Sequence, residues 1–218
     1  MKTLIVALIF FGFELSSLSS AQNARAQEST FFKSSWNIGF NAGLNWHIAE
    51  GNFPNNDHMI FLSPEKNAGV MLNATVGYDL SSVVSLRARL GFVEHNWPDI
   101  RYSSNSLPVK IVKYNSENIS VDFVVNINQW LDGDNARRKF EISTFAGIGL
   151  EHRDKASFNN EWYGAICRVG GQGSVKISSK IDFVIIFEVN MVGDNYNEYV
   201  RSFPLEGYPA LTFGLNFK

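Results

Sequence analysis

The stretch WNIGFNAGLNWHI, residues Trp36 to Ile48, decides the fold. Its apolar residues occupy every second position, and asparagine, glycine and histidine fill the positions between them. Because successive side chains of a β-strand point to opposite faces, this pattern predicts a strand with one apolar and one polar face. Similar segments recur along the chain, and their apolar faces carry no charge. This arrangement is typical of a closed barrel with lipid outside and a polar lumen inside.

Seven further segments alternate in the same way, and each is long enough to cross a bilayer at a tilt. They are residues 67–80, 83–95, 119–131, 139–151, 163–177, 181–193 and 208–218. The connections alternate in length: residues 79–82, 132–138 and 178–180 are short turns, and residues 49–66, 96–118, 153–162 and 194–207 are long loops. The sequence therefore predicts an all-β protein, an eight-stranded antiparallel up-and-down transmembrane β-barrel.

The lengths of the connections predict how the barrel is oriented in the membrane. In outer-membrane barrels the short turns face the periplasm, so we expect both termini of this chain to be periplasmic. Val109 to Tyr114 alternates once more inside the second long connection. We interpret it as an extension of the fourth strand above the membrane, because a ninth strand would break the up-and-down order.

The first 26 residues have the three parts of a cleaved secretory signal peptide. Lys2 gives a positive start, Leu4 to Phe13 an apolar run, and Ala24-Arg25-Ala26 a cleavage site. We expect cleavage after Ala26, with cleavage after Ala21 as the alternative, which leaves residues 27–218 as the barrel domain. No later run reaches about 18 uncharged apolar residues, which argues against a helical membrane protein.

Nine charged residues of the eight segments fall on the face predicted to point inward. They are Arg87, Arg89, Asp122, Glu141, Glu151, Arg168, Lys176, Asp182 and Glu188. An eight-stranded barrel is just wide enough for side chains to fill it, so confined charges must pair. We predict a structural lumen charge network, a salt-bridged plug made of Arg87, Arg89, Asp122, Glu141, Arg168 and Glu188. An excess of one sign would instead favour a narrow ion-selective pore.

Several stretches resemble the outer-membrane protein β-barrel domain family, the small eight-stranded porin-like barrels of Gram-negative bacteria. They are residues 36–43, residues 119–123, residues 146–151 and the closing Leu211-Thr212-Phe213-Gly214-Leu215-Asn216-Phe217. The resemblance implies a bacterial outer-membrane location, with membrane lipid as a partner. It also implies recognition by the barrel-assembly machinery through an aromatic residue near the C-terminus. Here Lys218 follows Phe217, so that signal is displaced by one residue.

Other classes of function have weaker support. The formal net charge of -2 gives no basic surface for nucleic acid, and Cys167, the only cysteine, allows no internal disulfide. His152 with Ser157, or His95 with Ser103 or Ser104, would be the candidates for acyl transfer, but no nucleophile motif surrounds them. His47, His95 and Glu151 share the inward face near one rim, where a metal site is conceivable. We expect no catalytic site, no metal and no cofactor.

The sequence thus favours a non-enzymatic integral outer-membrane barrel with a structural or surface-interaction role. The long loops are the candidate contact with an extracellular ligand, and the first of them is rich in apolar residues such as Phe53, Met59 and Phe61. A narrow porin-like channel for ions or small solutes is the alternative, and a lipid-modifying barrel enzyme is the third reading.

Overall fold

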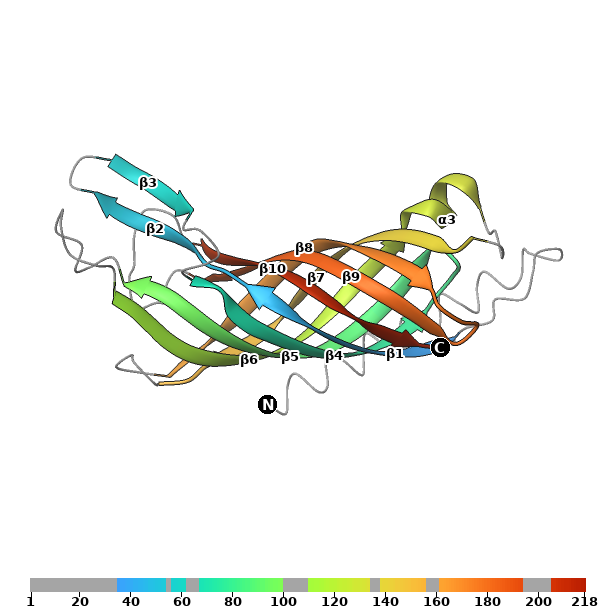
Figure 1. The fold of residues 1–218 in the computed structure, drawn as a ribbon, viewed down its shortest axis with the longest axis horizontal. Helices are drawn as coiled ribbons and strands as arrows, with labels where there is room; N and C mark the ends of the chain where they lie inside the picture. Colours follow the sequence, from blue (N-terminus) through green and yellow to red (C-terminus); the bar gives the residue numbers. More distant parts are fainter. Residues whose placement is uncertain are drawn as a thin grey trace. The chain divides into compact units, whose positions relative to one another are not determined.

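Eight long strands close into an antiparallel β-barrel (Figure 1). The computed structural model describes residues 35–53, 56–61, 67–99, 110–133, 138–155, 161–193 and 205–218. The barrel strands are β1 (Trp36–Asn45), β4 (Gly69–Asp79), β5 (Val84–Asp99), β6 (Lys110–Asn126), β7 (Phe140–Arg153), β8 (Trp162–Lys176), β9 (Ile181–Gly193) and β10 (Leu205–Phe217). Each pairs with the next along the chain, and β1 pairs with β10. The predicted fold class is confirmed.

Alternation along the strands separates an apolar exterior from a polar interior, as predicted. On the exterior, Phe40, Leu90 and Ile148 are 57, 60 and 71% exposed. All nine charged residues that the sequence placed inward are buried or half-buried. Cys167 lies on the exterior. Register explains this sorting, because a slip by one residue would turn every inward side chain outward.

The two ends of the barrel differ. The turns at residues 80–83 and 177–180 lie at the end where the chain finishes at Lys218, which we call the short-turn end (Figure 1). The opposite end, where β5 and β6 extend furthest, is the long-loop end. Pairing of β5 with β6 continues to Asp99 opposite Lys110, so the alternating stretch after Val109 extends the fourth barrel strand, as expected.

The first long connection contains a hairpin that the sequence analysis treated as loop. β2 (Ile48–Phe53) and β3 (Asn56–Phe61) pair with each other over six register positions. β2 meets the barrel through one pairing with β10, Ile48 opposite Gly207. The first barrel strand therefore ends at Asn45 and not at Ile48. The chain returns on itself here because a strand pair satisfies its own backbone groups.

The predicted fourth strand is wrong at its end, because residues after Asn126 turn into a short helix, α3 (Ile127–Asp132). Ile127 is therefore not an exterior strand residue. The Asn126 side chain accepts a hydrogen bond from the Gln129 backbone N–H and caps the helix. Gly133, with a φ of 72°, closes it by donating its N–H to the Gln129 carbonyl. Only glycine adopts this conformation without strain, which fixes where the helix ends.

No helix among the described residues is long and apolar enough to cross a membrane. Residues 1–34, which include the expected signal peptide, lie outside the described part of the chain.

Placing a charge on the exterior should disrupt the barrel in a bilayer. Leu90→Arg puts a cation on the apolar face, which costs roughly 2–4 kcal/mol near the bilayer midplane. Ser174→Arg is the matched control, because Ser174 faces a polar cavity in the lumen. We expect folding into lipid vesicles, measured by heat-modifiable gel mobility, to fall for Leu90→Arg and to persist for Ser174→Arg. The opposite order would reverse the assigned faces.

Candidate functional site

One row of the sheet brings opposite charges together inside the lumen. Asp122 on β6 lies opposite Arg87 on β5 and opposite Gly147 on β7, and Gly147 lies opposite Arg168 on β8. A Cβ at Gly147 would overlap the Asp122 carboxylate. Because Gly147 has no side chain, the carboxylate and the Arg168 guanidinium can meet across β7.

Arg168 connects the two carboxylates of this lumen ion-pair network, which we define as Arg87, Arg89, Asp122, Arg168 and Glu188. Its Nε lies 3.3 Å from Asp122 Oδ1, and its Nη2 lies 2.6 Å from Glu188 Oε2. Arg87 Nε donates to Asp122 Oδ2 at 2.9 Å. Arg89 binds Glu188 through two hydrogen bonds, of 2.7 and 2.9 Å. Paired bonds of this kind combine strength with fixed geometry.

Neutral groups complete the surroundings of the three arginines. The acceptors are Gln172 for Arg87, Asn73 for Arg89 and Ser120 for Arg168, at 2.7, 2.8 and 3.0 Å. Three guanidinium groups face two carboxylates, which leaves one positive charge in excess. The buried ring of Phe145 lies against two of the cations, with its centroid 4.5 Å from Arg87 Cζ and 5.6 Å from Arg168 Cζ. The negative face of an aromatic ring partly offsets such a charge.

An apolar layer lies next to the network on the side of the long-loop end. Met71 lies opposite Val93, and Ile166 lies opposite Val192, and all four side chains are at most 1% exposed. The same buried cluster also contains Val112, Tyr114, Tyr208 and Ala210. These packed side chains form an apolar level in the lumen next to the charged network.

A histidine and tyrosine cluster lies beyond the apolar layer. His47 Nε2 and His95 Nδ1 are 2.6 Å apart, and His95 Nε2 is 2.8 Å from Ser116 Oγ. Tyr208 donates its hydroxyl to Glu151 at 2.6 Å. The His95 ring stacks on Tyr114, whose hydroxyl lies 3.4 Å from His47 Nε2. The polar groups of this cluster bind one another inside the lumen.

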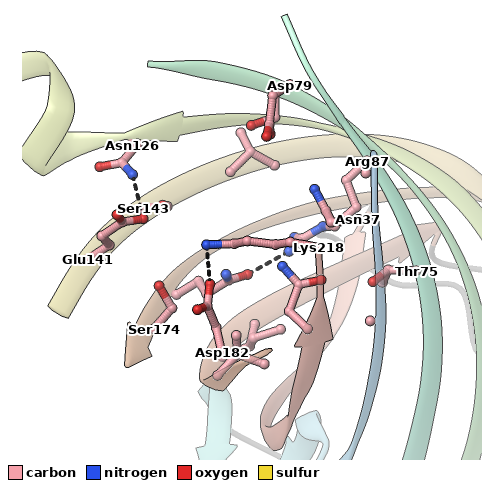
Figure 2. Close-up of a pocket in the computed structure, with 18 of the residues that line it drawn as sticks. Asn37, Thr75, Asp79, Arg87, Asn126, Glu141, Ser143, Ser174, Asp182 and Lys218 are labelled. Carbon is pink, nitrogen blue, oxygen red and sulfur yellow. Dashed lines mark hydrogen bonds and ion pairs between the residues drawn. The ribbon is translucent and has the colours of Figure 1, made fainter. Parts of the chain in front are cut away.

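On the other side of the network, a polar cavity of about 230 Å³ opens at the short-turn end. Amide, hydroxyl and charged side chains line it, among them Asn37, Thr75, Arg87 and Ser143 (Figure 2). Lys218 points back into this mouth, where its Nζ lies 2.6 Å from Asp182 Oδ2. The cavity therefore borders the network on the side of the short-turn end.

Searches with the whole sequence find no matching protein-family model and no significantly similar curated protein. Solved structures do match by shape. Neisserial surface protein A has a TM-score of 0.52 and 12% identity, over 85% of this chain and 98% of that one. The fold is that of the small outer-membrane β-barrels.

Two further structures match over a similar length. A major outer membrane protein from Thermus thermophilus has a TM-score of 0.47 and 11% identity, and covers 84% of this chain and 99% of that one. The attachment invasion locus protein of Yersinia pestis, in complex with the heparin analogue sucrose octasulfate, has a TM-score of 0.43 and 7% identity over 84% and 98%.

Five of the six predicted network residues meet in the barrel, and Glu141 does not. Glu141 lies at the short-turn end, where it accepts from Asn126 and sits 3.4 Å from Lys176 Nζ. The sequence analysis placed Glu141 correctly on the inward face but at the wrong height along the barrel axis. The face of a residue follows from its odd or even position in the strand, whereas its height depends on strand register.

The sequence analysis missed the apolar layer altogether. Met71, Val93, Ile166 and Val192 fall on the inward parity of their strands, so parity itself was the available signal. His95 also lies beside a serine that the sequence analysis did not consider. This serine is Ser116, whereas Ser103, Ser104 and Ser157 lie outside the described residues. In the part of the chain that the structure describes, no three His, Cys, Asp or Glu side chains are placed to hold a metal ion.

Removing one carboxylate from the network should destabilise the barrel strongly. Asp122→Ala leaves Arg87 and Arg168 without their shared buried partner, which costs about 3–5 kcal/mol. Glu141→Ala is the control, because the Glu141 and Lys176 side chains are 17 and 32% exposed, and a pair this open contributes less than about 1 kcal/mol. Urea unfolding in lipid vesicles measures both. Equal losses in the two variants would contradict the network described here.

Acid should weaken the long-loop end of the barrel. His47 lies beyond the end of β1, and burial lowers the pKa of its imidazole from 6.5 to about 3. Between these values the unfolded chain binds a proton that the folded chain does not, so the free energy of unfolding falls with decreasing pH. One such group lowers the free energy of unfolding by at most about 1.4 kcal/mol for each pH unit.

The measurement is urea unfolding at pH 7.5 and pH 5. We expect a smaller loss of stability on acidification in His47→Phe than in the wild type. His152→Phe is the control, because the His152 ring is only half-buried and stacks on Tyr163. This variant should lose as much stability on acidification as the wild type does. An unchanged loss in His47→Phe would show that another group carries the acid sensitivity.

Proposed function

We propose that this chain is a non-enzymatic integral protein of the bacterial outer membrane with a closed lumen, and that it acts through its long-loop end. Export by the signal peptide at residues 1–26 and insertion by the barrel-assembly machinery belong to the proposal. So does the orientation, with the short-turn end and both termini in the periplasm. The role is structural support of the membrane or contact with an extracellular ligand.

The exterior supports the membrane location. Large apolar side chains face outward on every barrel strand, which in water would form an apolar patch far beyond what soluble proteins tolerate. Aromatic rings gather near both ends of the strands. Trp36 packs against Tyr78 at the short-turn end, and Tyr163 stacks on His152 toward the long-loop end. Rings at these heights match the headgroup regions of a bilayer.

The packing of side chains in the lumen is the observation that supports the functional proposal. The ion-pair network, the apolar layer and the histidine cluster follow one another along the axis, and their side chains bind or pack against each other. A conducting pore needs a continuous polar path lined by groups that are free to exchange with ions or solutes. Here Arg89 and Arg168 are held by Glu188, and Met71 and Ile166 fill the next level.

The strands beyond the barrel support a role at the long-loop end. The β5–β6 ribbon and the β2–β3 hairpin both extend past the other strands (Figure 1). Among the described residues β3 pairs only with β2, so its other edge has free backbone groups. A strand edge of this kind can accept an extended segment of a partner.

The other two readings fit the lumen less well. A narrow channel would use the 230 Å³ cavity as its entrance, but the cavity ends at Arg87, which is paired with Asp122. An acyl-transfer enzyme would need a reachable nucleophile. In the described part of the chain, Ser116 is the serine hydrogen-bonded to a histidine, and it is 1% exposed. Glu151 also lies nearest the same nitrogen of His95 that faces Ser116, so it does not orient the ring from the opposite side.

Conductance in planar bilayers tests closure. We expect the wild-type barrel to show no steady channels, Glu141→Ala to behave like the wild type, and Asp122→Ala to open more often because its arginines lose a partner. Steady wild-type conductance that Asp122→Ala leaves unchanged would favour the channel.

Mass spectra of lipid A test the third possibility, a lipid-modifying enzyme. Such an enzyme would make the spectra differ between cells with and without the protein.

A further inference from the structure

The short helix α3 is fixed to the edge of the barrel at the short-turn end. Pairing of β6 with β7 stops at Asn126 opposite Ser143, so the first residues of β7 have no strand on that side. The Asn128 side chain accepts a hydrogen bond from the backbone N–H of Ile142, 2.5 Å away, in place of the missing strand. The helix is therefore held beside β7 and does not hang free below the barrel.

This helix has an apolar stripe whose two later residues are exposed. Ile127, Trp130 and Leu131 have the i, i+3, i+4 spacing of one helix face. Trp130 is 68% exposed and Leu131 is 72% exposed. Gln129 lines the lumen cavity, and Leu131 lies two residues, or about 200°, further round the helix. The stripe consequently faces away from the lumen.

The stripe continues the apolar exterior of the barrel. Phe140 and Ile142, both exposed on the outer face of β7, belong to the strand that holds the helix. Figure 1 shows α3 on the flank of the barrel at the short-turn end, and not across its mouth. Trp36 and Ile177 are exposed at the same end. The surface of α3 is thus continuous with the surface that meets lipid on the strands.

We propose that α3 lies in the headgroup layer of the bilayer at the short-turn end, with Trp130 and Leu131 inserted between phospholipid chains. An indole suits this layer because its body is apolar and its N–H donates to polar headgroups. The helix binds phospholipid itself, without a protein partner. The inference rests on the membrane location proposed above, and in that orientation the leaflet is the periplasmic one.

Fluorescence quenching by brominated phospholipids tests this in vesicles that contain no other protein. Subtracting the emission of Trp130→Phe from that of the wild type isolates Trp130. We expect phospholipid brominated near the headgroup to reduce this emission about twofold or more, and phospholipid brominated near the chain ends to reduce it less. The same subtraction with Trp162→Phe is the control, because Trp162 packs against the buried lumen cluster and brominated lipid should not reach it.

Leu90→Trp separates this proposal from the membrane location. Its added emission should be quenched by the deep bromines if the strands span the bilayer. If lipid bromines quench the tryptophan at position 90 but only aqueous iodide quenches Trp130, the placement of α3 is wrong and the membrane location stands. Absence of quenching at both positions would overturn the membrane location as well. Heat-modifiable mobility confirms that each variant is folded before measurement.

Discussion

Pairing of β1 with β10 is the constraint on which the rest of the structure depends. Eight register pairs, from Ile38 opposite Phe217 to Asn45 opposite Ala210, turn the sheet into a cylinder. Closure removes the two sheet edges that lipid could not satisfy, and it fixes the width of the interior. Inward side chains from distant strands then have to meet. The contact between Arg89 and Glu188, 99 residues apart, exists only because the cylinder is this narrow.

The sequence was sufficient to predict which residues share a face, because a period of two needs only local information. Parity placed Arg87, Asp122 and Glu188 inside and left apolar residues such as Leu90 and Ile148 outside. Parity does not supply the height of a side chain along the axis, because height depends on strand register and tilt. Glu141 was therefore assigned to the wrong level.

The sequence also did not predict α3, because Ile127 and Leu131 fit an alternating strand as well as a helix. Only the capping contacts of Asn126 and Gly133, together with the contact of Asn128 with β7, decide between the two. The hairpin β2–β3 was missed for a similar reason. The eight-strand count left residues 49–66 as a loop, although a long loop can pair with itself.

The distribution of the ion pairs along the sequence has a consequence for how the barrel assembles. Arg168 binds Asp122 on β6 and Glu188 on β9. Arg89 on β5 binds the same Glu188. The contacts of Arg168 join strands that are neighbours or next neighbours in the sheet, whereas the contact of Arg89 on β5 with Glu188 on β9 crosses the lumen. That contact cannot form while the sheet is still open, and contacts between distant residues form late. A half-built barrel therefore leaves the Arg89 guanidinium without Glu188. Until the last strand docks, the Arg89 side chain has to stay hydrated, so closure of the sheet and the dehydration of Arg89 are one event.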